Sequence, residues 1–84
     1  ITIHDHNIQD IHEKFTLITA NLRYPTLKRL CPHIAQITEE DSAVVVSGIK
    51  TDEASYLLNE FTQNRFKCVW KTFEKGWAGM VFVR

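Results

Sequence analysis

The closing stretch FKCVWKTFEKGWAGMVFVR, residues 66–84, constrains the fold more than any other part of the sequence. Side chains alternate along two runs that flank Glu74, Lys75 and Gly76. These three residues fit a hairpin loop in which a type I turn is closed by a glycine in the left-handed conformation. Such a loop pairs Phe73 with Trp77 and so decides which side chains share a face of the sheet. The sequence therefore predicts an antiparallel hairpin here.

In this register, one face of the hairpin is almost wholly apolar and is expected to join the core, with Trp70, Met80 and Phe82 as large members. The other face mixes cations, aromatic rings and valines, and it predicts a partner-binding site. The predicted binding residues are Lys67, Lys71, Phe73 and Trp77. Aromatic residues anchor protein interfaces, and rings beside cations also stack single-stranded bases. Two structural alternatives are that residues 7–22 cover this face, or that it pairs with further parts of a longer chain.

The first half of the chain is read as mainly helical. Residues 7–22 carry apolar side chains at spacings of three and four, which is typical of an amphipathic helix. Pro25 and Pro32 bracket residues 26–31, which are expected to form a short helix. A helix–turn–helix reading of residues 7–31 is disfavoured because the second helix would be too short.

The second half alternates strands and a helix. Residues 34–48 predict two short strands joined by a polar turn, and Ala43–Val46 should form a central strand with both faces covered. Residues 51–65 are the clearest helix, since apolar residues recur there at i, i+3, i+4 and i+7. The expected inward residues are Ala54, Leu57, Leu58 and Phe61.

Together these segments predict a single α+β domain over residues 1–84. Its small antiparallel sheet of about four strands, in two hairpins, packs with two main helices. The predicted order is helix, short helix, strand, strand, helix, strand, strand. The chain begins at Ile1 and stops at Arg84 directly after an apolar run, so we expect a fragment of a longer protein.

Charge and composition limit the kinds of partner that this chain is expected to bind. The net charge is zero and the pI is about 7.1, which disfavours strong phosphate binding. Residues 61–84 nevertheless hold five bases against one acid, so nucleic acid stays an alternative. Cys31 and Cys68 are expected to be buried thiols in an intracellular protein, with one disulfide between them as the alternative. Apolar runs are far shorter than the roughly 20 residues of a membrane helix, so no membrane partner is expected.

No catalytic signature stands out. The sequence has no G-x-S-x-G motif and no glycine-rich phosphate loop. Neither His4 with His6 nor Cys31 with His33 has the spacing typical of a zinc site. The sequence therefore predicts a non-catalytic module that recognises a protein or a second copy of itself, without a metal, a cofactor or catalytic residues. Single-stranded nucleic-acid or DNA binding is the alternative, and a small enzyme or metal-binding domain is the third.

Overall fold

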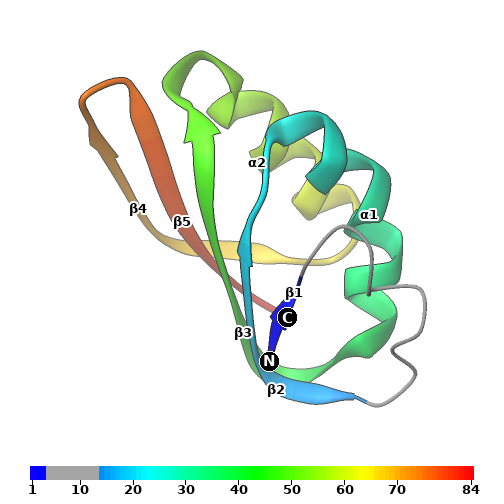
Figure 1. Cartoon of the computed structure of the whole chain (residues 1–84). Coiled ribbons are helices and arrows are strands. Elements are labelled where there is room, and N and C mark those ends of the chain that lie inside the picture. The colour runs from blue at the N-terminus through cyan, green and yellow to red at the C-terminus, as the bar shows by residue number, and fades with distance from the viewer. Residues whose placement is uncertain (4–13) are drawn as a thin grey trace.

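The computed structural model describes residues 1–3 and 14–84. One five-stranded sheet, in the order β1-β2-β3-β5-β4, lies against two helices that cover the same face (Figure 1). The elements are β1 (Thr2–Ile3), β2 (Phe15–Asn21), α1 (Tyr24–Ile37), β3 (Thr38–Lys50), the 3₁₀ turn η2 (Thr51–Glu53), α2 (Ala54–Gln63), β4 (Lys67–Glu74) and β5 (Trp77–Val83). The predicted α+β class is confirmed. The strand number and order differ from the prediction, because the N-terminal half adds parallel strands.

The N-terminal half forms a parallel strand–helix–strand unit. β2 pairs in parallel with both β1 and β3, and α1 connects β2 to β3. The helix predicted over residues 7–22 is therefore wrong for residues 15–21, while residues 7–13 lie outside the described part of the chain. Ile18 is buried and Leu17 is exposed, which is the two-residue alternation of a strand. The β-branched residues of this segment favour that pleated conformation.

Helix α1 is longer than the short helix predicted over residues 26–31. Pro25 occupies its first turn, where the missing N–H removes no intrahelical hydrogen bond. Pro32 lies inside the helix on an exposed position, so the one carbonyl that it leaves unpaired can be hydrated. The buried stripe continues beyond Pro32 to Ile34 and Ile37. Packing of this stripe on the sheet outweighs the proline penalty.

The hairpin predicted over residues 34–48 is wrong, because residues 34–37 end helix α1 and residues 38–48 belong to the single 13-residue strand β3. Strand β3 lies between β2 and β5, so the central position predicted for Ala43–Val46 is confirmed. Val44 and Val46 are fully buried, whereas Ala43 and Val45 are only partly buried. The prediction that both faces are covered is therefore wrong, because both helices lie on one side.

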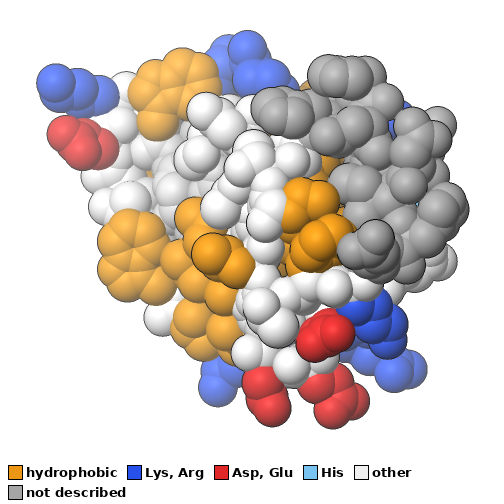
Figure 2. Space-filling model, turned by 60° about the horizontal axis from the view of Figure 1, so that its bottom comes forward, with side chains coloured by type: hydrophobic (Ala, Val, Ile, Leu, Met, Phe, Trp, Pro, Cys, Tyr) orange, Lys and Arg blue, Asp and Glu red, His pale blue; other side chains and the backbone are white. Residues whose placement is uncertain are grey.

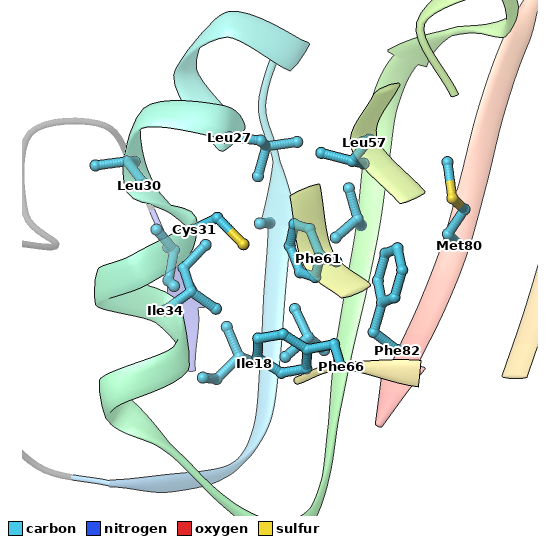
Figure 3. Close-up of a cluster of buried hydrophobic side chains, with 14 of the residues drawn as sticks. Ile18, Leu27, Leu30, Cys31, Ile34, Leu57, Phe61, Phe66, Met80 and Phe82 are labelled. Atoms are coloured by element: carbon cyan, nitrogen blue, oxygen red, sulfur yellow. The ribbon is translucent and has the colours of Figure 1, made fainter. Parts of the chain in front are cut away.

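Helix α2 confirms the clearest sequence prediction. Ala54, Leu57 and Phe61 are buried, as their spacing indicates, and Phe61 stacks on Phe82 of β5 with ring centroids 4.2 Å apart. Figure 3 shows side chains of α1 and α2 meeting those of the sheet in one cluster, which also contains Phe66. One hydrophobic core therefore joins both helices to the sheet.

The β4–β5 hairpin is present, but its turn is shorter than predicted. Lys75 and Gly76 have φ values of 52° and 81°, which is typical of a two-residue type I′ turn. Glu74 therefore pairs with Trp77, and the predicted pairing of Phe73 with Trp77 is wrong by one residue. The reason is that a type I′ turn matches the twist of the strands that it joins.

Candidate functional site

The helix-free side of the sheet, called the open face here, is the most distinctive surface of the described residues. It receives every second side chain of the strands, while the alternate side chains enter the core. Across the strands these residues form four rows, from the pairing registers: Leu17, Ala43, Val83 and Lys67; Thr2, Thr19, Val45, Val81 and Trp70; Gly79 and Thr72; Lys50, Trp77 and Glu74. Ser47 pairs with Asn21, at the point where the β3–β5 register shifts. The middle of the open face is thus mainly apolar.

Three large side chains of the open face reach solvent. Leu17 is 51% exposed, Trp70 is 55% exposed and Trp77 is 48% exposed. The molecule seen from another side carries neighbouring groups of hydrophobic side chains, with acidic side chains along the lower rim of the view (Figure 2). Large exposed apolar side chains gathered on one face favour an interaction site there.

Small side chains lie between the two tryptophans of the open face. Gly79 and Thr72 form a low row, and the row of Trp70 lies on one side of it and the row of Trp77 on the other. A Cβ at Gly79 would meet only ordinary contacts, at 3.5 Å from Thr72 and 3.7 Å from the Val46 carbonyl. Small residues therefore separate the two rows that carry the indole rings.

Polar groups border the apolar middle. Lys67 ends the row of Leu17, and Lys50 and Glu74 stand on either side of Trp77. At the far edge, the Thr19 hydroxyl donates to the Thr2 hydroxyl at 2.9 Å. An apolar centre with a polar border is the usual anatomy of a protein interface.

The structure separates the four predicted partner-binding residues into two pairs. Lys67 and Trp77 lie on the open face, as predicted. Lys71 pairs with Met80 and Phe73 pairs with Ala78, and both partners are buried on the helix side. The prediction of one common face is therefore wrong for Lys71 and Phe73.

Trp70 is the residue that sequence reasoning misplaced most. A β-bulge between Cys68 and Trp70 shifts the register, so Trp70 faces Val81 on the open face. Met80 and Phe82 are buried as predicted, whereas the core assignment of Trp70 is wrong. Leu17 was missed because its segment was assigned to a helix. Its alternation with Ile18 was the available signal.

A charged hollow of about 290 Å³ lies where β3 begins, lined by Glu40, Asp41, Arg65 and Arg84. The Arg84 guanidinium donates to the Ala35 carbonyl and lies 5.6 Å from the centroid of the Phe66 ring. Arg84 therefore has a structural role that ties the end of β5 to α1. Carboxylates and guanidiniums of opposite charge line the hollow together, so it favours no single ligand charge.

The described residues provide no constellation for bond-making chemistry. Cys31 is fully buried, and burial, reinforced by the negative charge of Glu60, raises the pKa of its thiol to about 12. It is therefore protonated at neutral pH and is a poor nucleophile. Within residues 1–3 and 14–84, no group of three or more His, Cys, Asp or Glu side chains could hold a metal ion. His4 and His6 lie outside that part of the chain.

Two further observations bear on the sequence predictions. Cys31 and Cys68 are both free thiols; Cys31 is buried as expected, whereas Cys68 is only partly buried. Among the described helices, none is long and apolar enough to cross a membrane.

Two solved structures that share this architecture are of methyltransferases. The crystal structure of a ribosomal protein L11 methylase from Lactobacillus delbrueckii subsp. bulgaricus matches with a TM-score of 0.87 at 28% identity, covering 92% of this chain and 40% of that one. Precorrin-6y C5,15-methyltransferase from Geobacter metallireducens GS-15 matches with a TM-score of 0.65 at 10% identity, covering 94% and 48%. The second likeness is one of fold alone. The fold is thus one that occurs within methyltransferases.

The family model of ribosomal protein L11 methyltransferase (PrmA) matches residues 1–84, and the chain belongs to this family. It is 29% identical over 77 residues to the enzyme of that name from Lactobacillus johnsonii, covering 92% of this chain and 24% of the relative. It is 26% identical over 74 residues to that from Dictyoglomus turgidum, covering 88% and 25%. The chain therefore spans about a quarter of the length of these relatives.

Membership of this family overturns the predicted function. The sequence predicted a non-catalytic interaction module and no enzyme, with nucleic-acid binding or a metal site as alternatives, whereas the relatives are methyltransferases by name. The prediction was wrong because the absence of a catalytic motif from these 84 residues was taken to exclude an enzyme, although a fragment of a longer protein was expected. A missing catalytic motif in a segment that matches a quarter of its relatives does not argue against an enzyme.

Proposed function

We propose that this chain is part of a methyltransferase that acts on ribosomal protein L11, and that the open face docks the protein substrate. The observation that carries the proposal is the exposure of Leu17, Trp70 and Trp77 on one sheet face, in a family named for a protein substrate. A ribosomal protein as substrate would also place the enzyme inside the cell.

In this proposal, the methyl donor binds outside the part of the enzyme that this chain represents. A small-molecule site typically encloses its ligand in a pocket of about 300–1,000 Å³. The hollow at Glu40, Asp41, Arg65 and Arg84 has about 290 Å³, and the one at residues 68–71 has about 260 Å³. Both hollows are open to solvent and do not enclose a ligand, so neither suits a methyl donor. The remaining three quarters of the relatives' length is where we expect the donor to bind.

Docking contributes to methyl transfer through positioning. A protein substrate held by a surface away from the reacting atoms presents its acceptor group at high effective concentration. Substitutions in such a surface are expected to raise KM for the protein substrate while kcat changes little. Lys67 and Trp77 keep their predicted role as binding residues here, and Trp70, Leu17 and Val81 join them.

The test is kinetic, in the longer enzyme that carries this chain, with ribosomal protein L11 as substrate. Trp70→Ala and Trp77→Ala should each raise KM by roughly tenfold or more, as for an aromatic anchor, with kcat within about twofold. The matched control is Tyr56→Ala, because Tyr56 is 64% exposed on α2, away from the open face. It should leave KM unchanged.

Two outcomes would contradict the proposal. An unchanged KM in both tryptophan variants would remove the docking role of the open face. A steep loss of affinity with added salt would indicate phosphate contacts rather than apolar docking on a protein.

A further inference from the structure

Strand β4 is an open edge of the sheet. Its only strand neighbour among the described residues is β5, and all its residues are exposed except the partly buried Cys68. An edge strand presents unpaired N–H and C=O groups that can hydrogen-bond another strand. This edge is separate from the open face, because its bonding direction lies in the plane of the sheet.

The hairpin register identifies the free backbone groups. The residues that flank a two-residue turn, Glu74 and Trp77, form a hydrogen-bonded pair. Hydrogen-bonded and non-hydrogen-bonded pairs alternate along an antiparallel ladder. Lys71 and Phe73 occupy the non-bonded pairs, so their N–H and C=O groups point outward from the sheet. An incoming strand would meet these two residues first.

A hollow adjoins this free edge at the bulge. It has about 260 Å³ and is lined by Cys68, Val69, Trp70 and Lys71. Val69 is 53% exposed and, with Trp70, gives the hollow apolar walls. A partner strand that pairs along residues 70–74 could place one of its own apolar side chains in this hollow, at the Trp70 end of the paired segment.

The charge of the edge favours one kind of occupant. The net charge of residues 67–75 is +2. This segment contains three lysines, Lys67, Lys71 and Lys75, and one acidic residue, Glu74. Lysines on an edge strand discourage indiscriminate pairing, and they favour a partner strand that carries carboxylates. The lysines therefore favour an acidic partner strand, and the hollow at the bulge favours one that carries an apolar side chain.

We propose that the β4 edge binds an extended, acidic polypeptide segment, which adds a strand along residues 70–74 and inserts an apolar side chain at the bulge. Main-chain bonds to Lys71 and Phe73 supply affinity, and the lysines supply selectivity, as in other strand-addition complexes. This inference goes beyond the substrate docking proposed above, because its main-chain hydrogen bonds form at the β4 edge and not on the open face. Trp70 and Lys67 lie where the two surfaces meet.

The probes are two ten-residue peptides, one alternating Glu and Val and one alternating Lys and Val, added to the isotope-labelled chain. The Glu/Val peptide should slow amide hydrogen exchange at Lys71 and Phe73 and shift their NMR signals. The Lys/Val peptide should do neither. Reversing both charges with Lys67→Glu and Lys71→Glu should weaken binding of the Glu/Val peptide at least about tenfold. Lys28→Glu, an exposed change on α1, should not.

A backbone variant separates strand addition from simple charge attraction. Phe73→Pro removes an outward N–H but no bond to β5, so it should abolish peptide binding and keep the fold. Phe73→Ala keeps that N–H and should retain part of the binding. Equal binding of both peptides, or shifts confined to Leu17 and Trp77, would overturn the proposal. Stronger, salt-sensitive shifts of the same amides with a single-stranded oligonucleotide would also overturn it, in favour of nucleic acid.

Discussion

Trp70 lies directly opposite Val81 on the open face, while its neighbour Lys71 lies opposite the buried Met80. The bulge after Cys68 and the two-residue turn at Lys75 together produce this arrangement. It puts an indole ring into solvent and a lysine above the core side of the hairpin. The pairing of Trp70 with Val81 is therefore what creates the proposed docking surface.

This register predicts a contrast in stability. Met80→Ala removes a fully buried side chain and should lower the free energy of unfolding by about 2–5 kcal/mol. Trp70→Ala truncates an exposed ring and should cost less than about 1 kcal/mol. Urea unfolding of both variants measures the difference. A larger loss for Trp70→Ala than for Met80→Ala would show that the indole belongs to the core.

The turn predicts a second pair of effects. Gly76 has φ of 81°, and a Cβ added there would meet nothing within 4 Å. Gly76→Ala should therefore cost about 1–2 kcal/mol from backbone conformation alone. Lys75→Asn should be neutral or slightly stabilising, because asparagine tolerates φ above zero. Thermal unfolding checks both, and a neutral Gly76→Ala would contradict the type I′ turn.

The close approach of Gly48 to Asn21 predicts that substitutions at these two positions affect stability jointly. Its φ is 83°, and an added Cβ would lie 2.3 Å from the Asn21 Oδ1 atom. Gly48→Ala should cost more than Gly76→Ala, because a clash adds to the backbone penalty. Asn21→Ala should relieve the clash, so the two substitutions should be non-additive in a double-mutant cycle. Additive losses would mean that the side chain of Asn21 moves away freely.

Cys31 predicts a loss of stability at alkaline pH. Burial, followed by the negative charge of Glu60, raises the pKa of the thiol from the ordinary 9.0 to about 12. Above about pH 9 the unfolded chain loses this proton while the native chain keeps it. The free energy of unfolding therefore falls as pH rises towards 12, and the stability conferred by the neutral thiol is fully present below pH 9.

The check compares the wild-type chain with Cys31→Ala by urea unfolding at about pH 8 and about pH 10.5. The variant lacks the titrating thiol, so its stability should fall less, and the difference between the two proteins should narrow at the higher pH. Cys68→Ala is the matched control, because Cys68 lies on the partly exposed edge strand. A constant difference for Cys31→Ala would contradict the raised pKa.

Local patterns predicted some elements well and others poorly. The helix over residues 54–63 follows from the spacing of its apolar residues, because the residues that make this pattern lie within a few positions of one another. The segment with Ile18 fits a helical stripe and a strand alternation equally, so its sequence alone cannot decide between them. β2 is a strand because it pairs with β3, which lies more than 20 residues further along the chain.

The candidate site shows the same division. Lys67 and Trp77 were predicted on the partner-binding face from alternation, and they lie on the open face. Trp70, Lys71 and Phe73 were misplaced because one residue in the turn and one in the bulge each reverse the alternation. A single-residue shift changes no local propensity, yet it moves side chains between the core and solvent.

By itself, the sequence determined the α+β class, helix α2, the central strand around Val44 and Val46, and the burial of Met80 and Phe82. Each of these depends on hydrophobic periodicity within one element, which local residues set. Tertiary structure alone decided the parallel pairing of β2 with β3, the passage of α1 through Pro32, and the face occupied by Trp70. These depend on contacts between distant segments, where burial of a shared core outweighs the modest preferences of individual residues.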